Sequence, residues 1–483
     1  MLLFRFAEKS LGLISTVILA RILVPEDFGL VAMAMSIISL VELASSFSFE
    51  TVLIQREQPT RAHYDTAWTL NILFGASCAL VMIALSKPAA AFYSEPRLVA
   101  VVCVIASGWA LQSLENVGAV DFRRQMDFRK EFVFLALKKF VGFSVTVILA
   151  FVLRNYWALV AGMMAGRLAG VVSSYVMSPF RPRLGLAARR DLFRFSSWLL
   201  VANIVNFAET RFAHFFVGRV EGPTPLGLFT IASDFASLPT TELSAPINRA
   251  AFPGYSRLAG RRPDLQSEVT IVIGMLALST IPAALGLMTL AEPLVRLVLG
   301  EKWIAIVPIL QILVLGSCLR AVMSNYHAVF LAVGHPHLTP VLEGCRVAVM
   351  IPLTFVLAEM HGLVGVAVAQ AISMGFGFIT SSVVLVKVLE LPWRAFAAQL
   401  LRPALASLAM VAIVHAISTS LAQANSAAVT QLAAGVVAGI AAFVVALGAV
   451  WLVSGRPAGA EFTLVQWAGR MSAGWARGRS GGE

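Results

Sequence analysis

Long runs of apolar residues, each about the length of a membrane span, follow one another along almost the whole chain. A helix needs about 20 mostly apolar residues to cross a bilayer, where it satisfies its own backbone hydrogen bonds. Short polar segments separate the runs, so the pattern predicts an all-α polytopic membrane protein with about fourteen transmembrane helices. The approximate predicted ranges are 2–23, 29–49, 66–86, 98–118, 132–153, 156–178, 193–217, 226–248, 269–290, 304–332, 338–358, 362–386, 399–421 and 427–453.

The composition agrees with this pattern and excludes several classes of function. Of the 483 residues, 58% are hydrophobic and 13% are charged, and the mean hydropathy is +0.82. The predicted spans leave no room for a nucleotide-binding or soluble catalytic domain. The chain also lacks a GxxxxGK[ST] phosphate loop, so ATP-driven transport by this chain alone is not expected. We expect no cofactor and no catalytic residues.

The net charge of +11 indicates how the chain is oriented in the membrane, and it is weaker evidence about what the chain binds. In a soluble protein such a charge would suggest nucleic acid, but cytoplasmic loops of membrane proteins also collect Lys and Arg. With the N-terminus in the cytoplasm, 24 basic residues fall on the cytoplasmic side and 7 on the other. This bias predicts that both termini are cytoplasmic and that nucleic acid is not a partner. The four cysteines and seven histidines show no metal-ligand spacing, so no metal site is expected.

Two segments 198 residues apart repeat the same residues in the same register. The residues Arg21, Pro25, Gly29, Leu30 and Ala34 recur as Arg219, Pro223, Gly227, Leu228 and Ala232. The repeat predicts two six-helix lobes related as parallel repeats, followed by two extra helices. The expected boundaries are 1–183 and 184–390 for the lobes, 391–453 for the extra pair and 454–483 for a basic cytoplasmic tail. Secondary transporters built this way bind their substrate between the halves near the midplane.

Six basic residues fall inside predicted spans, where a charge facing lipid costs about 2.5–3.5 kcal/mol. They are Lys138, Lys139, Arg167, Arg211, Arg320 and Arg346. Arg211 and Arg320 lie deep and have no obvious acidic residue four positions away, which favours a cavity-lining role. An interior with more basic than acidic groups suits an anionic cargo such as a pyrophosphate, because Arg binds phosphate oxygens through several donors.

The acidic residues inside the predicted spans could have more than one role. Glu42, Glu209 and Asp234 are candidates for taking up a proton or Na⁺ and coupling transport to a gradient. Asp234 could instead pair with Arg211, and uncoupled transport remains an alternative. Glu343 and Arg346 are three residues apart, so they could form a pair that only holds the fold.

Several phrases of the chain resemble one family. They are LARILVPEDFGLVAMA at 19–34, LIQR at 53–56, FRRQMDFR at 122–129, SAPINRAAFPGYSR at 244–257, AEPLVRLVLGEKW at 291–303 and LAVGHP at 331–336. Together they resemble the bacterial polysaccharide flippases for O-antigen and exopolysaccharide. These belong to a superfamily that also contains multidrug exporters and the lipid II flippase. The resemblance runs from about residue 10 to about residue 394.

This resemblance implies a transporter of the bacterial inner membrane, not an enzyme. Its cargo would be an undecaprenyl-diphosphate-linked oligosaccharide repeat unit, moved by alternating access while the lipid tail stays among the membrane lipids. Basic cavity residues would hold the diphosphate, a role we carry over to Arg211, Arg320 and Arg346 as a hypothesis. Polymerase and chain-length-control proteins are candidate partners, and H⁺ or Na⁺ are candidate coupling ions. The family often has an Asp near the position of His214, so here a coupling role would pass to Glu209 or Asp234.

Three alternatives remain from the sequence. A multidrug exporter of the same superfamily would favour a more acidic cavity than these six basic residues provide. A membrane-bound polysaccharide polymerase or ligase usually needs a large periplasmic loop with catalytic residues, and the outside loops here are short. The third alternative is a scaffold protein of an assembly complex that has no transport activity. The charges buried in its membrane helices would then cost stability without serving a function.

Overall fold

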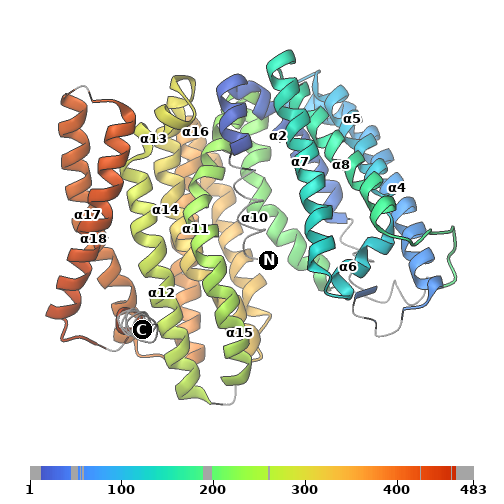
Figure 1. The fold of residues 1–483 in the computed structure, drawn as a ribbon. Helices are drawn as coiled ribbons and strands as arrows, with labels where there is room; N and C mark the ends of the chain where they lie inside the picture. The colour runs from blue at the N-terminus through green and yellow to red at the C-terminus, as the bar shows by residue number, and fades with distance from the viewer. Residues whose placement is uncertain are drawn as a thin grey trace, which may run out of the picture. The chain divides into compact units, whose positions relative to one another are not determined.

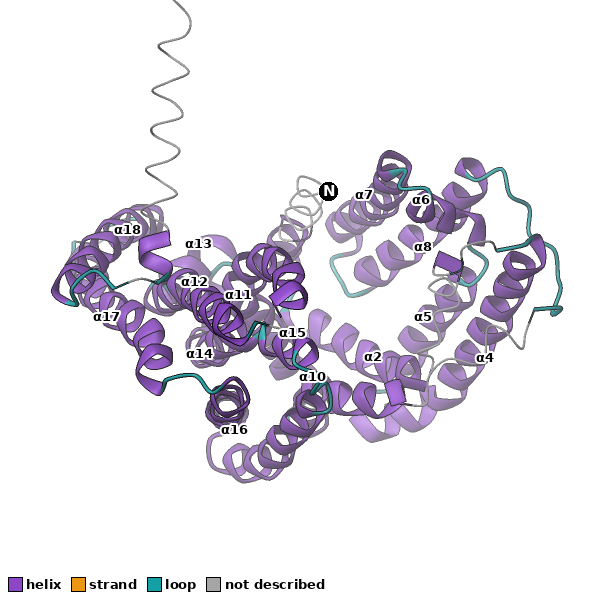
Figure 2. Cartoon of the chain, turned by 90° about the horizontal axis from the view of Figure 1, so that it is seen from below, coloured by secondary structure: helices purple, strands orange, loops and turns teal. Residues whose placement is uncertain are grey.

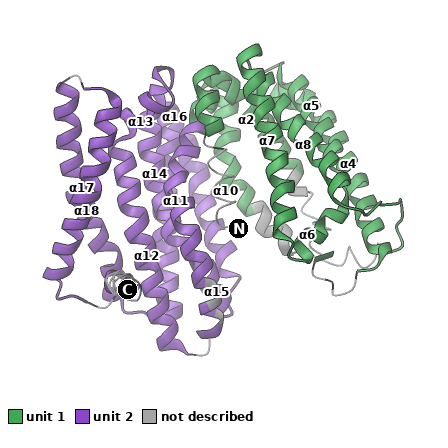
Figure 3. Cartoon of the chain, viewed as in Figure 1, with its two compact units in different colours: residues 1–230 green, residues 231–483 purple. Residues whose placement is uncertain are grey.

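The computed structural model describes residues 12, 14–44, 53–54, 56, 59–188, 198–258, 261–424, 426–457 and 459–463. Within these ranges every regular element is a helix, as Figure 2 shows, and this confirms the predicted all-α class. Half of the first predicted span and most of the predicted basic tail lie outside the described residues. The chain forms two compact units, residues 1–230 and 231–483 (Figure 3). The predicted lobe boundaries stay a prediction.

Unit 1 contains the helices that correspond to the first seven predicted spans, as far as they are described (Figure 1). They are α2 (Pro25–Ala44), α4 (Arg61–Tyr93), α5 (Leu98–Gln112), η1 (Val117–Ala119), α6 (Val120–Arg124), α7 (Phe128–Leu153), α8 (Trp157–Met177) and α10 (Trp198–Val220). The chain between α5 and the segment η1–α6 bends by 69°, so the pair forms either one broken span or a re-entrant loop.

Unit 2 begins inside α11 and contains the remaining helices. They are α11 (Pro223–Leu258), α12 (Arg262–Thr289), α13 (Ala291–Val298), η2 (Glu301–Ile306), α14 (Val307–Met323), α15 (Tyr326–Ala332), α16 (Leu338–Leu389), α17 (Trp393–Gln423) and α18 (Ala428–Val453). In the described part of the chain, eight helices are long and apolar enough to cross a membrane, or nine with the bent pair. This supports a multi-pass membrane protein, whereas the number fourteen stays a prediction.

Helix α16 folds back on itself and supplies two of the predicted spans. Its 52 residues would extend about 78 Å if straight, far more than the ~30 Å of bilayer hydrocarbon. Gly362 breaks the helix with φ 55° and ψ −135°, a conformation open to glycine because it has no Cβ. A Cβ added to Gly377 would lie 2.7 Å from Cδ of Arg346, although a straight helix would separate these residues by about 46 Å. The two legs therefore run side by side, and the break falls at the first residue of the predicted span 362–386, directly after the gap that follows span 338–358.

The repeated segments at the starts of α2 and α11 cross in direct backbone contact within unit 1. A Cβ on Gly29 would overlap the carbonyl oxygen of Pro223, and a Cβ on Gly227 would overlap that of Pro25. Each added atom would also lie 3.0 Å from the backbone nitrogen of the other glycine. Small residues permit this close approach of two helices in a membrane. The contact is reciprocal, which is what equivalent positions of two repeats would produce.

One apolar cluster in the core of unit 2 is shared by α11, α12, α14, α15, α16 and α17. Tyr326 stands in this cluster at the start of α15, and its hydroxyl lies 3.1 Å from the Ser382 hydroxyl on α16. The side of α14 and α15 that faces this cluster is therefore apolar. Their polar residues lie on another side.

Candidate functional site

Two neighbouring helical segments of unit 2 each carry a row of polar side chains, and a third segment adds a single one. Residues four and seven positions apart lie on one face of a helix, so each row marks a single face. Ser324 and Asn325, which join α14 to α15, keep right-handed helical dihedral angles, so the row continues across the junction. We define the polar face as Asp234, Thr241 and Asn248 on α11, Arg320, Ser324 and His327 on α14–α15, and Thr339 on α16.

Hydrogen bonds between side chains connect the two rows with each other and with Thr339. The amide nitrogen of Asn248 donates to the Ser324 hydroxyl at 2.7 Å, which joins α11 to the end of α14. Asn325 donates in turn to the amide oxygen of Asn248 at 2.9 Å. The His327 Nδ1 lies 3.1 Å from the Thr339 hydroxyl, which joins α15 to α16. The polar face is thus one continuous surface rather than separate rows.

The exposure of the polar face decides what it contacts. Asp234, Thr241, Arg320, Ser324 and His327 are exposed, and the segment that carries Arg320, Ser324 and His327 is apolar enough to cross a membrane. A charged side chain facing hydrocarbon would cost several kcal/mol, whereas one facing a water-filled space does not. Water or a polar cargo therefore suits the polar face better than lipid does. Such a surface can bind a phosphate group through Arg320 and hydroxyl groups through its amide, hydroxyl and imidazole side chains.

The structure separates the predicted site residues of unit 2 into two environments. Arg320 and Asp234 belong to the polar face. Arg346 is only 6% exposed and lies between the two legs of α16, with its Nη1 3.2 Å from the Met374 sulfur. Its guanidinium therefore stands inside the helical hairpin, and the part it plays toward a cargo stays a prediction.

The structure describes fewer of the side chains predicted for the site in unit 1 than in unit 2. Glu209 on α10 is buried at 6% exposure, and Arg211 is half-buried two residues further on. Glu42 lies in α2, but its side chain is outside the described residues. Arg211 and Arg320 belong to different units, so a shared role in binding one cargo stays a prediction.

Two other membrane cations of unit 1 have partners within that unit. Lys138 on α7 forms an ion pair with Glu115 at 2.5 Å. Arg167 on α8 donates to the Ile105 carbonyl oxygen at 2.7 Å and stacks over the Trp109 ring at 5.4 Å. The sequence identified these cations but gave no sign of the partners, which lie at least 23 residues away.

Sequence reasoning did not single out Asn248 or Ser324. Both are uncharged, and only charged groups stand out against the high cost of burial in lipid. The spacing of Arg320, Ser324 and His327 at four and seven positions was visible in the sequence and could have indicated a polar face. Its continuation onto α11 and α16 was not visible, because that depends on helix packing.

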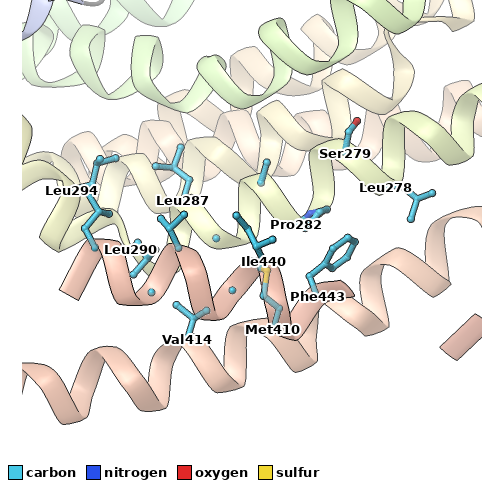
Figure 4. Close-up of a pocket in the computed structure, with 16 residues that line it drawn as sticks. Leu278, Ser279, Pro282, Leu287, Leu290, Leu294, Met410, Val414, Ile440 and Phe443 are labelled. Atoms are coloured by element: carbon cyan, nitrogen blue, oxygen red, sulfur yellow. The ribbon is translucent and has the colours of Figure 1, made fainter. Parts of the chain in front are cut away.

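Unit 2 also has a cavity whose lining differs in chemistry from the polar face. A cavity of about 480 Å³ lies among α12, α13, α17 and α18, and Figure 4 shows its leucine-rich lining. Its one hydroxyl, from Ser279, already donates to backbone oxygens of its own helix at 3.0 Å. The cavity suits hydrocarbon and offers nothing to a sugar or a phosphate. In the described part of the chain, no group of three or more His, Cys, Asp or Glu side chains is placed to hold a metal ion.

Comparisons with known proteins agree with a membrane transporter of glycans. A family profile described as "Polysaccharide biosynthesis protein" matches residues 18–308. The lipopolysaccharide biosynthesis protein WzxC of Escherichia coli (strain K12) is 25% identical over 420 residues, 85% of each chain. The succinoglycan biosynthesis transport protein ExoT of Rhizobium meliloti (strain 1021) is 24% identical over 319 residues, 65% of this chain and 64% of ExoT. The solved structure of the lipid II flippase MurJ in an inward closed conformation covers 93% of this chain and 99% of its own. Its TM-score is 0.75 at 14% identity, a likeness of fold alone.

Proposed function

This chain belongs to the polysaccharide biosynthesis protein family, and we propose that it is a flippase for undecaprenyl-diphosphate-linked oligosaccharide repeat units. The family expected from the sequence phrases is confirmed. Relatives named for lipopolysaccharide biosynthesis and succinoglycan transport support a transporter rather than an enzyme. The fold shared with a lipid II flippase supports a lipid-linked cargo. The glycan would serve exopolysaccharide, capsule or lipopolysaccharide synthesis.

The observation that carries this proposal is the exposed polar face of unit 2. A lipid-linked oligosaccharide presents a diphosphate and many hydroxyl groups, and the polar face offers a cation next to uncharged hydrogen-bonding groups. Arg320 would bind the diphosphate oxygens, since a guanidinium offers five donors in a fixed geometry. Arg211 in unit 1 would be a second phosphate ligand. Arg346 would act from inside the α16 hairpin, by adding positive charge near the same surface.

The proposed orientation places the polar face toward the cytoplasm. The basic-residue bias puts the start of α14 at the outer side and both termini in the cytoplasm of a bacterium, with the chain in the inner membrane. Arg320 then lies about 20 Å along the helix axis from Val307, and His327 about 30 Å. The cargo would meet this face on the side where it is made. Alternating access would then expose the glycan to the periplasm while the lipid tail stays in the bilayer.

Coupling to an ion gradient is a further part of the proposal. Asp234 stands on the exposed polar face, where a proton or Na⁺ could reach its carboxylate. Glu209 is buried in unit 1, and Glu42 is the remaining candidate. Polymerase and chain-length-control proteins would take over the repeat units after transport.

The test follows lipid-linked glycan in a strain that lacks this gene. Periplasm-exposed glycan is labelled on spheroplasts and compared with total undecaprenyl-linked glycan, in the presence of the intact chain or a variant. We expect Arg320→Ala and Arg211→Ala to leave the glycan unexposed at normal membrane levels of protein. Arg262→Ala is the matched control, because Arg262 is an exposed cation paired with Glu390 away from the polar face.

One result would refute the proposed function, and a second would refute only the proposed diphosphate ligands. Normal glycan exposure in the deletion strain would show that the chain acts elsewhere, and drug sensitivity of that strain would then favour the multidrug exporter. Full glycan exposure with both arginine variants would show that Arg211 and Arg320 are not needed to bind the diphosphate. The flippase function would then still stand.

A further inference from the structure

We propose that Asn248, Ser324 and His327 form a sugar-binding subsite that contacts hydroxyl groups of the cargo beside its diphosphate. This inference rests on the proposed flippase function and deepens it, because it separates recognition of the glycan from recognition of the phosphate. It concerns uncharged side chains of unit 2 that connect α11 to α14 and α15.

The chemistry of these three side chains matches sugar hydroxyls, which both donate and accept hydrogen bonds. Arginine and lysine only donate, whereas an amide, a hydroxyl and an imidazole provide both functions. The Nδ1 of His327 faces the Thr339 hydroxyl, which leaves Nε2 of this exposed ring for a ligand. Asn248 uses one amide hydrogen for Ser324 and one acceptor site for Asn325, so a donor and an acceptor site remain.

The existing hydrogen bonds fix the orientation of the Asn248 amide. The Ser324 hydroxyl donates its proton to the Ala321 carbonyl oxygen at 2.6 Å, so it must accept from Asn248. The nitrogen of the Asn248 amide therefore faces Ser324, and its oxygen faces Asn325. A side chain held from two helices has already lost its rotamer freedom, which lowers the entropic cost of binding a ligand.

An unsatisfied acceptor stands directly behind this amide. Asn325 is 2% exposed, and within the described residues its Oδ1 has no hydrogen-bond partner. A buried acceptor left in this state costs about 1–3 kcal/mol, and native structures contain few of them. A water that enters when the side chains covering this oxygen move aside, and that bridges to a cargo hydroxyl, would satisfy it. The buried orphan acceptor is the observation that points to a ligand.

The spacing along the helix connects this subsite to the diphosphate. Ser324 follows Arg320 by four residues, so the two lie on one face about 6 Å apart along the axis. A diphosphate bound at Arg320 would thus place the first sugars against Ser324 and then His327. Recognition at the sugar nearest the phosphate would select among repeat units that share the same lipid carrier.

The experiment measures the affinity of the purified full chain in detergent for two probes. One is undecaprenyl diphosphate without sugar, and the other is the lipid-linked repeat unit extracted from the deletion strain. We expect Ser324→Ala and Asn248→Ala to weaken binding of the lipid-linked repeat unit about tenfold each, and to leave undecaprenyl diphosphate unchanged. Arg320→Ala should weaken both probes.

Two controls separate loss of contact from loss of fold. Ser324→Thr keeps the hydroxyl and should keep near-parental affinity for the lipid-linked unit. Ser420→Ala removes an exposed hydroxyl on α17 that bonds only its own helix, at 2.8 Å from the Ala416 carbonyl oxygen, and should change neither affinity. Melting temperatures of all variants are recorded beside the affinities.

Equal weakening of both probes by Ser324→Ala, or no weakening of either, would overturn the sugar subsite. So would a loss of affinity in Ser324→Thr as large as in Ser324→Ala. A parental chain that binds neither probe would overturn the proposed function itself, and this inference with it. Comparison between variants therefore tests the subsite, and the parental affinity tests the function.

Discussion

Adding a methyl group at Gly29 tests the backbone crossing between the two repeated segments. A Cβ at this position would overlap the Pro223 carbonyl oxygen, far inside the ~3.5 Å at which non-bonded heavy atoms rest. The obstacle is backbone, which cannot rotate away as a flexible side chain would. Helices α2 and α11 would have to separate by about 1–2 Å at this point, and they would lose contacts on both sides.

The expected loss of stability follows from the free-energy cost of overpacking a tight contact. Inserting a methyl group into a tightly packed contact costs about 1–3 kcal/mol, so Gly29→Ala should lower the free energy of unfolding by that amount. Gly227→Ala should have a similar effect, because its added Cβ meets the Pro25 carbonyl oxygen in the reciprocal way. The separation forced by one methyl group makes room for the other. The double variant should therefore cost less than the sum, by about 0.5 kcal/mol or more.

The assay is unfolding of the purified chain in detergent, with two control variants on other helices. A Cβ at Gly375 would have nothing within 4 Å, and one at Gly316 would lie 3.6 Å from the nearest atom, an ordinary contact. Both controls should match the parental chain. The reasoning is refuted if Gly29→Ala matches these controls, or if the two losses at the crossing simply add.

Three further predictions concern other parts of the fold, each measured as stability in detergent. Glu461→Ala should cost about 3–5 kcal/mol, because it leaves Arg402 buried without the partner now 3.0 Å away, and Glu461→Leu combined with Arg402→Met should recover most of it. Between α4 and α5, hydrogen bonds from Arg97 lower the pKa of the Glu95 carboxyl below its usual 4.5. Arg97→Ala should thus reduce stability at neutral pH, and the difference should vanish as the pH falls through that lowered pKa, whereas a difference that persists in acid would contradict this origin. Gly362→Ala should cost about 1–3 kcal/mol, because a residue with a Cβ rarely adopts φ 55° with ψ −135°; unchanged stability would show that the α16 turn has another conformation.

The class of fold could be predicted from the sequence because a bilayer leaves few choices. Apolar runs of about 20 residues must be helical in hydrocarbon, so the helices follow directly from hydropathy. The predicted gap at residues 359–361 lies directly before the break at Gly362. The repeat was visible in the residues shared by the segments that start at Arg21 and Arg219. Its close crossing was not, since nothing in either segment alone says which other segment it will meet.

Identifying the candidate site required the tertiary structure to a greater degree than predicting the fold class did. Arg320 and Arg346 are both single arginines among the apolar residues of a predicted span, although Arg346 has Glu343 three positions before it. The structure exposes Arg320 on a polar face and buries Arg346 against the second leg of α16. Hydropathy records that a charge is present in a span, but the direction in which it points is set by the neighbouring helices.

The sequence by itself therefore determined the helices, the expected orientation and the family, because these depend on local composition and on residues read in order. Only the tertiary structure joined Asn248 to Ser324 and placed Asn325 behind them, 77 residues along the chain from Asn248. Uncharged polar side chains cost little wherever they lie, so their pattern in the sequence indicates little about a partner. Their function depends on which side chains the packing brings within hydrogen-bonding distance.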